Sequence, residues 1–311
     1  MLSLQKPDII CTHESDLDGL VSGMLLQRVA RNRFGADVRL EAFHYQGWQR
    51  RVLAEKVAWV SDFTFETRMD RSEWVIFDHH VTDVTPKAAR LIHDPTKSAA
   101  RLCYEVCQDD GLTTPVLDRL VHLTNVGDLF LTEDPEFTLA CDYSSLVKTY
   151  GFWPLHELCG GKPEALVDHP LLEVMAVKRR VEDPIGFDWA RRHVQEISPQ
   201  IGAVETVVGN TNLIVHRMLN EGAVPYPVLV TLFKKGNGAM VVSFRSRNGE
   251  ALKIALKLQG GGHPNAAGTT LPQGVRDFEA GVVFLRQALN PRLPKSAGLS
   301  SMEGAMAGLS F

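Results

Sequence analysis

Three segments of the chain place carboxylates and imidazoles directly after runs of apolar residues. The segments are HESDLDG, SDF and FDHH, and their ionisable side chains include His13, Asp16, Asp18, Asp62, Asp78, His79 and His80. Carboxylates gathered at one place repel one another unless cations lie between them. A mixed set of Asp and His ligands suits Mn²⁺ or a similar ion better than an all-oxygen calcium site. These residue types therefore indicate a divalent metal site rather than polar strand ends or solvated turns.

A fourth segment, TNVGDLF, places Asp128 after the apolar pattern LDRLVHL. Taken alone, it is typical of a turn at the end of a helix, in which Gly127 supplies an unusual backbone angle. Beside the other three segments, we interpret Asp128 as a further metal ligand.

The spacing of the first two aspartates indicates two metal ions rather than one. Asp16 and Asp18 are two residues apart in an expected loop, so their carboxylates can face different ions, and Asp62 can bridge them. Two ions about 3.5–4 Å apart bind both the attacking and the leaving oxygens in phosphoryl transfer, and they lower the pKa of a bound water. This arrangement predicts a phosphoester hydrolase.

The elements that must position these side chains alternate between strands and helices. We expect strands over residues 8–12, 38–45, 57–61 and 74–77, and a helix over 19–30. This alternation predicts an α/β domain with a largely parallel sheet, whose strand ends meet in one crevice. After residue 98 the pattern is mainly helical as far as about residue 197, with a break near Pro184 and Gly186.

From Val204 the pattern changes to strands in ETVVG, NLIVH, PVLVTLF and AMVVSFRS, followed by a helix in RDFEAGVVFLRQAL. A second, smaller α/β domain is therefore expected. The predicted organisation is a catalytic metal-binding domain over residues 1–185, a helical linker over 186–203, a substrate-binding domain over 204–290 and a flexible tail over 291–311.

Two segments of the second domain suit phosphate binding. Consecutive glycines let a backbone approach a ligand closely and offer N–H groups to phosphate oxygens, although an isolated GGGHPN is more typical of a tight turn before a helix. The arginines of SFRSR alternate on an expected strand, and a guanidinium binds phosphate in a bidentate manner; the alternative is a solvated edge strand. The candidate residues are Arg245, Arg247, Gly260, Gly261, Gly262 and His263.

The composition is that of a soluble globular protein, with 44% hydrophobic and 23% charged residues. A net charge of −4 argues against a sequence-independent grip on long duplex DNA. The five cysteines form no CxxC pair, and we interpret them as small buried hydrophobic residues in a reducing cytoplasm. Neither a signal peptide nor a membrane span is expected.

In their order, HESDLDGLVSG, VSDF, FDHH and NVGD resemble the four motifs of the DHH phosphoesterase superfamily. SFRSR and GGGHPNAAG resemble the DHHA1 domain of RecJ-like nucleases and nanoRNases, and the resemblance extends from about residue 9 to 270. It implies a parallel-sheet DHH domain joined by a helical linker to a smaller α/β DHHA1 domain. The motif DLDG departs from the DGD form of the best-known nanoRNases, so the subfamily stays open.

The resemblance also implies roles for the site residues. One Mn²⁺ would be held by His13, Asp16 and Asp62, and the other by Asp18, Asp62, His79 and Asp128. His80 would donate a hydrogen bond or a proton to the departing group, and Asp78 would orient a neighbouring histidine. We consider Mg²⁺ and Co²⁺ as substitutes for Mn²⁺.

These inferences predict a manganese-dependent phosphodiesterase of the nanoRNase type, an exoribonuclease that releases nucleoside 5′-monophosphates from short oligoribonucleotides. We expect short RNA or small nucleotides as partners and no membrane, and we allow for a homodimer. The alternatives are a phosphatase of 3′-phosphoadenosine 5′-phosphate, a cyclic dinucleotide phosphodiesterase, a RecJ-like exonuclease of single-stranded DNA and a nucleotide sensor without catalysis.

Overall fold

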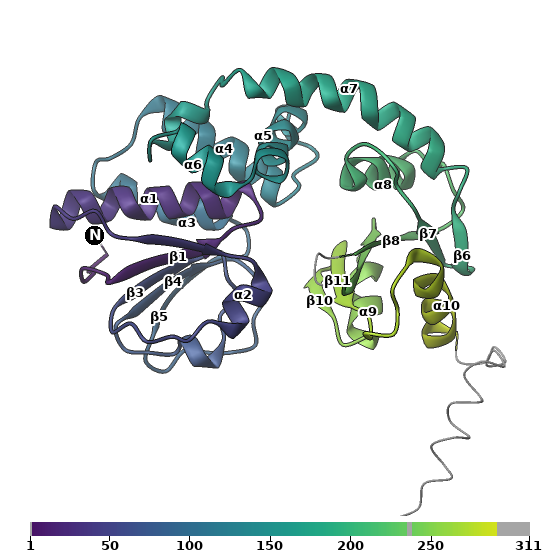
Figure 1. Ribbon diagram of the computed structural model, residues 1–311, viewed down its shortest axis with the longest axis horizontal. Coiled ribbons are helices and arrows are strands. Elements are labelled where there is room, and N and C mark those ends of the chain that lie inside the picture. Colours follow the sequence, from purple (N-terminus) through teal and green to yellow (C-terminus); the bar gives the residue numbers. More distant parts are fainter. Residues whose placement is uncertain (1, 235–237, 291–311) are drawn as a thin grey trace, which may run out of the picture. The chain divides into compact units, whose positions relative to one another are not determined.

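The computed structural model describes residues 2–234 and 238–290, apart from the side chain of His263. The tail predicted over residues 291–311 lies outside this part. The chain forms two compact units, Met1–Val177 and Lys178–Phe311, and each unit has its own sheet (Figure 1). The predicted α/β class is therefore confirmed.

The first unit contains a five-stranded sheet with the order β2-β1-β3-β4-β5, in which every neighbouring pair is parallel. Its strands are β1 (Ile9–His13), β2 (Leu40–Phe43), β3 (Ala58–Ser61), β4 (Trp74–Asp78) and β5 (Arg90–His93). Four of them coincide with the predicted strands to within a residue at each end or lie inside them. The exposed edge strand β5 was not predicted, because RLIH is short and only half buried.

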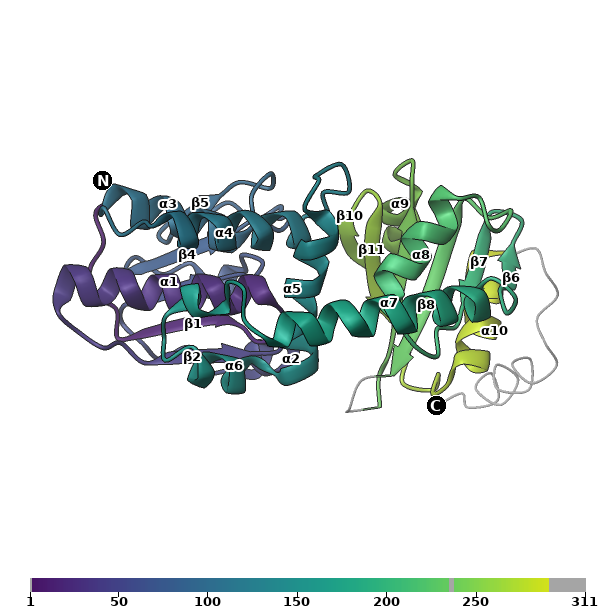
Figure 2. The ribbon, with the colours of Figure 1, turned by 90° about the horizontal axis from the view of Figure 1, so that it is seen from above.

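Helices cover both faces of this sheet, and α1 and α3 lie across one of them (Figures 1 and 2). The helices are α1 (Leu17–Phe34), α2 (Tyr45–Arg50), α3 (Ala99–Asp109), α4 (Pro115–Asp128), α5 (Phe137–Tyr150) and α6 (Phe152–Leu158), with short 3₁₀ turns at Thr67–Met69 and Pro163–Leu166. Successive side chains of a strand point to opposite faces of the sheet. Ile10 therefore packs in the apolar cluster under α1, while Ile9 and Cys11 pack in the cluster around Trp48 on the other face.

The second unit contains a mixed six-stranded sheet with the order β10-β11-β9-β8-β7-β6. Its strands are β6 (Gln195–Ser198), β7 (Ile201–Val204), β8 (Val228–Lys234), β9 (Met240–Ser246), β10 (Gly261–His263) and β11 (Ala266–Thr270). Its helices are the end of α7 (Leu171–Ala190), α8 (Thr211–Asn220), α9 (Glu250–Lys257) and α10 (Phe278–Leu289). One apolar cluster lies between the sheet, α9 and α10, and another lies between the sheet and α8.

Two expectations for the region between the domains are corrected by the secondary structure. Helix α7 continues through Pro184 and Gly186, where a break was expected. The segment 186–203 is also not a helical linker, because only its start belongs to α7, and it then forms β6 and most of β7. These two strands pair as an antiparallel hairpin around a short turn, a local pairing that the charged, helix-like composition of the segment concealed.

The expected strand NLIVH is a helix, α8. The side chain of Asn210 accepts hydrogen bonds from the backbone N–H groups of Asn212 and Leu213, which begins the helix. Ile214 and Met218, one turn apart, are both buried against the sheet. The β-branched residues suggested a strand, but the cap and the helical spacing determine the structure.

All five cysteines are free and buried, as predicted for small hydrophobic residues. No helix among residues 2–234 and 238–290 is both long and apolar enough to cross a membrane.

Candidate metal centre

The carboxyl ends of three adjacent parallel strands bring the predicted ligands together. β1 ends at His13, β3 ends one residue before Asp62, and β4 ends at Asp78. Asp16 is the N-cap of α1, and its side chain accepts a hydrogen bond from the backbone N–H of Gly19 at 3.0 Å. Segments far apart in the sequence therefore meet at the crevice that the predicted topology required.

The first group of ligands consists of His13, Asp16 and Asp62. The Nδ1 atom of His13 lies 2.8 Å from Oδ2 of Asp16 and 3.4 Å from Oδ2 of Asp62. The donor atoms of the group lie within 4.8 Å of one another, so the three side chains can hold a metal ion.

The second group consists of Asp18, His79 and Asp128, with the other oxygen of Asp62 beside it. The Nε2 atom of His79 lies 3.4 Å from Oδ2 of Asp128, 3.6 Å from Oδ1 of Asp62 and 3.8 Å from Oδ2 of Asp18. Asp62 thus presents Oδ2 to the first group and Oδ1 to the second. This is the geometry that a bridging carboxylate needs.

Asp62 also has an unusual backbone, with a φ of 60° in the left-handed region. A non-glycine residue adopts this conformation only where its surroundings impose it, and such positions cluster at functional sites. The hydrogen bond from the backbone N–H of Asp62 to the carbonyl of Phe77, at 2.9 Å, ties this turn to β4.

Asp128 is the last residue of α4, and Gly127 lies inside the helix without a positive φ. The alternative considered for this segment taken alone, a turn in which Gly127 supplies an unusual backbone angle, therefore does not apply. A Cβ at Gly127 would instead meet Oγ of Ser144 and lie 2.9 Å from the carbonyl oxygen of Ala140. The glycine lets α4 approach α5 closely, and this packing fixes the position of Asp128.

Asp18 is held more tightly than its sequence suggested. It is fully buried, and its two oxygens accept hydrogen bonds from the backbone N–H groups of Ala99 and Ala100, at 2.8 and 2.7 Å. These are donors of the first turn of α3. Each carboxylate oxygen has a second lone pair, so Asp18 can bind a cation while it remains bonded to the helix.

The buried carboxylates repel one another. Burial, together with the charge of Asp62, raises the pKa of Asp18 to about 7. Burial and the charge of Asp18 raise the pKa of Asp128 well above its usual range. Burial lowers the pKa of His13, but Asp16 and Asp62 outweigh this effect and raise the pKa to about 11. The protonated imidazole thus acts as a counter-charge to the carboxylates.

The donor set fits two divalent cations. The buried atoms Oδ2 of Asp62 and Oδ2 of Asp128 have no hydrogen-bond partner within the described part of the chain, which is costly for acceptor atoms away from water. Hard carboxylate oxygens and imidazole nitrogens are ligands for Mn²⁺ and similar ions. Cations at the two groups would satisfy these oxygens and neutralise the repulsion.

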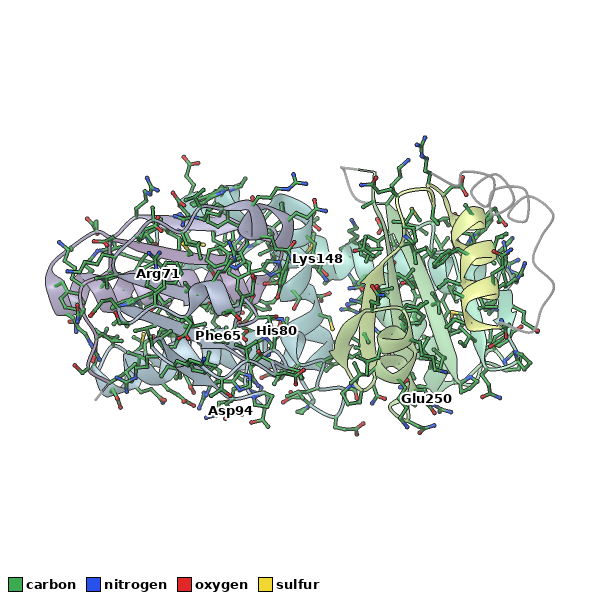
Figure 3. The ribbon with its side chains drawn as sticks, turned by 90° about the horizontal axis from the view of Figure 1, so that it is seen from below. Phe65, Arg71, His80, Asp94, Lys148 and Glu250 are labelled. Atoms are coloured by element: carbon green, nitrogen blue, oxygen red, sulfur yellow. The ribbon has the colours of Figure 1, made fainter. Side chains whose placement is uncertain are left out.

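His80 is placed differently from His79. Its Nδ1 lies 2.7 Å from Oδ1 of Asp78, a fully buried carboxylate, so Asp78 contacts His80 and not His79 through this atom. The backbone carbonyl of His80 accepts a hydrogen bond from Nε2 of His93. Burial lowers the pKa of His80, but Asp78 and Asp62 raise it above its usual value. Figure 3 shows His80 and Phe65 at the same end of the unit, with Arg71 farther away.

An aromatic wall beside the ligands was not predicted as part of the site. The ring of Tyr45 meets the imidazole of His13 edge-on, with centroids 5.1 Å apart, and lies 6.3 Å from that of His80. Phe63 packs against both Tyr45 and His13, and stacks on Trp48. Trp48 is fully buried, whereas Tyr45 contacts the imidazoles of both His13 and His80 edge-on.

Three buried hydroxyls form a network under the ligands. Ser22 donates to Oγ of Ser61, Ser61 donates to Oγ1 of Thr12, and Thr12 donates to the carbonyl of Gly19, at 2.7–2.9 Å. Ser22 is fully buried, although it lies in the helix that follows the first motif. Thr12, Ser61 and Gly19 each adjoin a candidate ligand, so the network joins β1, β3 and α1 where these ligands start.

We expect Ser61→Ala to lower the free energy of unfolding by about 1–3 kcal/mol, because it removes the central member of a buried hydrogen-bond network. Urea denaturation at constant slope measures this change. Ser145→Ala is the matched control, since the hydroxyl of Ser145 bonds only the carbonyl of Cys141 in its own helix. Equal effects of the two substitutions would contradict a special role for the network.

Gly19 follows Asp18 in the first turn of α1, and a Cβ there would overlap the carbonyl oxygen of His13. We expect Gly19→Ala to destabilise the protein by about 3 kcal/mol, at the upper end of overpacking effects, because the overlapping atom is backbone. The same substitution should weaken manganese binding. Thermal unfolding and a manganese titration test both effects.

Gly47→Ala is the control for this steric prediction. Gly47 lies in α2, and the nearest atom to its Cβ would be 3.8 Å away, in Phe43. Alanine is favoured over glycine in a helix, so this variant should be as stable as the original protein or up to about 1 kcal/mol more stable. A Gly19→Ala protein as stable as the Gly47→Ala protein would refute the overlap.

The substrate candidates of the second unit have different environments. Arg245 is a half-buried residue of β9, whereas Arg247 lies beyond the end of the strand and is exposed. The expectation that both extend from one strand face is therefore wrong for Arg247. Arg245 pairs with Ala266 of β11, which in turn pairs with His263 of β10. The side chain of His263 lies outside the described part of the structure.

GGGHPNAAG forms a β-hairpin, not a turn before a helix. β10 and β11 pair antiparallel around Pro264 and Asn265, and Asn265 accepts a hydrogen bond from the backbone N–H of Gly249. A Cβ at Gly260 would overlap Gly268, and one at Gly262 would lie 2.6 Å from Ala266 and Ala267. These two glycines serve strand packing. Only Gly261 has open space at its Cβ position, so close approach of a ligand is best supported there.

The sequence and the structure were compared with known proteins. Residues 203–290 match the family model of the DHHA1 domain. A search among curated protein sequences gave no match.

Among solved structures, the pGpG-specific phosphodiesterase PggH of Vibrio cholerae is similar with a TM-score of 0.53 and 14% identity, over 90% of this chain and 99% of that chain. The structure of exonuclease RecJ bound to manganese is similar with a TM-score of 0.54 and 16% identity, over 95% of this chain and 94% of that chain. RecJ of Thermus thermophilus in complex with Mn²⁺ is similar with a TM-score of 0.55 and 17% identity, over 94% of this chain and 53% of that chain. The chain thus spans about half the length of the Thermus protein.

The described residues combine a parallel-sheet unit that carries clustered Asp and His side chains with a second unit that matches the DHHA1 domain model. Residues 203–290 thus match the DHHA1 domain, as the motifs SFRSR and GGGHPNAAG indicated, and the fold of the chain is similar to the folds of PggH and RecJ.

Proposed function

We propose that this protein is a manganese-dependent phosphodiesterase that hydrolyses short oligoribonucleotides to nucleoside 5′-monophosphates. The observation that carries the proposal is the division of Asp62 between two groups of ligands, one oxygen facing His13 and the other facing His79. A two-ion phosphoester site requires such a bridging carboxylate.

In this proposal, His13, Asp16 and Asp62 hold one Mn²⁺, and Asp18, Asp62, His79 and Asp128 hold the other. When bound, the two ions would polarise the phosphate and make a water molecule acidic enough to attack it near neutral pH. The remaining chemistry belongs to side chains of the chain. RecJ structures that contain Mn²⁺ support the choice of this metal.

His80 is the proposed general acid. Nδ1 of His80 lies 2.7 Å from Asp78; burial lowers the pKa of His80, but Asp78 and Asp62 raise it above its usual value, which favours the protonated imidazole. A donor nitrogen of His80 lies in one candidate ligand group with Asp62 and His79, and so beside the place where the phosphate would bind. There it can donate its proton to the departing ribose oxygen, while Asp78 stabilises the imidazolium.

Two observations support short RNA as the substrate. The acidic chain, with a net charge of −4, lacks the basic excess that a long nucleic acid would require. The similar structure of a pGpG-specific phosphodiesterase points to a dinucleotide, the shortest oligoribonucleotide. This second observation also favours pGpG itself as a candidate substrate.

The test is an incubation of the metal-stripped protein, with and without added Mn²⁺, with a graded set of substrates. The set contains pGpG, pApA, RNA and DNA oligomers of increasing length, 3′-phosphoadenosine 5′-phosphate and cyclic di-GMP. We expect manganese-dependent release of 5′-monophosphates, fastest from the shortest RNAs. Cleavage of pGpG but not pApA would narrow the proposal to a guanine dinucleotide. Cleavage of only the last two compounds, or only of DNA, would overturn it.

A further inference from the structure

Arg245 lies on the sheet face that α8 covers. It pairs across the strands with Leu229 of β8, which packs against Ile214 and Val215 of α8. Its own neighbour Phe244 points to the opposite face, into the cluster under α9 and α10. Arg245 therefore extends toward the start of α8, at the edge of the apolar contact between helix and sheet.

The guanidinium of Arg245 is held by neutral oxygen atoms. Nη1 donates to Oγ of Ser243 at 2.7 Å and to the carbonyl of Phe244 at 3.1 Å, and Nη2 donates to Oδ1 of Asn212 at 3.1 Å. A guanidinium has five N–H donors, and these bonds use three of them. Within the described residues, Nε–H and one Nη2–H have no acceptor. Together they form an edge that can grip a phosphate in a bidentate manner.

This arginine is also a buried charge without a counter-charge. Burial lowers the pKa of Arg245, and no charged neighbour is among the causes of the shift. No carboxylate within the described part of the chain lies at ion-pair distance from it, although a half-buried charge is normally paired. An anionic ligand would supply the missing partner.

Asn212 is well suited to keep the charge of Arg245 available. It stands in the first turn of α8, whose start is fixed by Asn210, so its side chain has a defined origin. An amide oxygen orients a guanidinium about as well as a carboxylate oxygen does, but it carries no charge. An aspartate at the same position would form an ion pair and compete with a phosphate for the arginine.

We propose that Asn212 is a positioning residue for substrate binding, which holds Arg245 in place for a phosphate of the nucleotide without neutralising it. The inference rests on the proposed function in taking a phosphate ester as the ligand. Asn212 lies outside all the motifs of the sequence analysis. It belongs to α8, a helix whose sequence suggested a strand.

The experiment compares full-length Asn212→Ala, Asn212→Asp and Arg245→Ala with the unchanged protein and with Asn220→Ala, a control at the other end of α8. Binding of pGpG and of 3′-phosphoadenosine 5′-phosphate is measured calorimetrically in EDTA, so that nothing is hydrolysed. Thermal unfolding is measured for every variant. With Mn²⁺, KM and kcat are measured on whichever compound is cleaved.

We expect Arg245→Ala and Asn212→Asp to weaken binding of the tighter probe about tenfold or more, and Asn212→Ala to weaken it less, since a charged hydrogen bond contributes about 1.5–3 kcal/mol. Asn212→Asp should meanwhile unfold at the same or a higher temperature, because the new carboxylate pairs with the arginine. In turnover, KM should rise while kcat changes less than about threefold.

Opposite movements of affinity and stability in Asn212→Asp separate this role from a structural one. Unchanged affinity of Asn212→Asp would overturn the inference, as would no measurable binding of either probe to the unchanged protein at millimolar concentration. Weakened binding without cleavage of any oligoribonucleotide would support the role of Asn212 and refute the proposed function. If pGpG is cleaved but the Asn212→Asp protein binds it with unchanged affinity, the proposed function is supported and the role of Asn212 is refuted.

Discussion

Replacing Asp62 with alanine should abolish activity and remove manganese from the protein. The two oxygens of Asp62 face both candidate ligand groups, Oδ2 at 3.4 Å from His13 and Oδ1 at 3.6 Å from His79. Its loss therefore disables both proposed ions, each of which stabilises the transition state by several kcal/mol. We expect kcat/KM to fall by about 10³-fold or more, and bound manganese to fall from about two ions per chain to less than one.

Metal analysis of the dialysed protein and the rate of substrate hydrolysis are the two measurements. Asp37→Asn is the matched control, because Asp37 is an exposed aspartate of the same unit that pairs only with Arg31 on the surface. An Asp62→Ala protein that retained two manganese ions, or hydrolysed substrate at a near-normal rate, would show that Asp62 is not the bridge. A circular dichroism spectrum establishes that the variant is folded.

Replacing His80 with alanine should produce the second large effect, but without loss of metal. The Nδ1 of His80 lies 2.7 Å from Oδ1 of Asp78, which leaves Nε2 as the nitrogen that can donate a proton to the departing oxygen. Loss of a general acid lowers kcat by about 10²–10⁴-fold. The rate of the unchanged protein should fall as pH rises through the pKa of His80, because its proton is then lost, and the variant should lack this fall.

The control for this prediction is His122→Ala, a half-buried histidine of the first unit that faces Asp134 and Glu136. It should leave both the rate and the metal content unchanged. His80 also lies within reach of Asp62 and His79 as a candidate ligand, so the manganese content of His80→Ala decides between the two roles. A loss of one ion per chain would assign His80 to the metal and remove it as the proton donor.

The first unit was largely predictable because its signals are local. Short apolar runs that end in ionisable residues identified β1, β3 and β4, and the rule that parallel strand ends meet at one edge brought His13, Asp62 and His79 together. The surroundings of Gly127 and Ser22 could not be predicted, for the opposite reason. Their burial depends on α5 and on β3, elements that no pattern around either residue reveals.

The second unit was less predictable because several of its strands form only through pairing with strands that are distant in the sequence. β10 is three residues long, and it is a strand only because β11 pairs with it and β9 pairs with β11 in turn. Composition indicated helix for residues 186–203 and strand for NLIVH, and both expectations failed where a hairpin or a helix cap decided the conformation. The same limitation hid Asn212, which meets Arg245 across 33 positions of sequence.

The two backbone hydrogen bonds that Asp18 accepts from α3 bear on how inactive relatives are recognised from sequence. A descendant that abandoned catalysis could lose Asp128 at little cost to folding, because Asp128 accepts no hydrogen bond from the first turn of a helix within the described residues. Asp18 would persist, since its loss would leave buried N–H groups without an acceptor. The second aspartate of DLDG is therefore a poor marker of activity, and a retained DLD with a missing Asp128 would identify a pseudoenzyme.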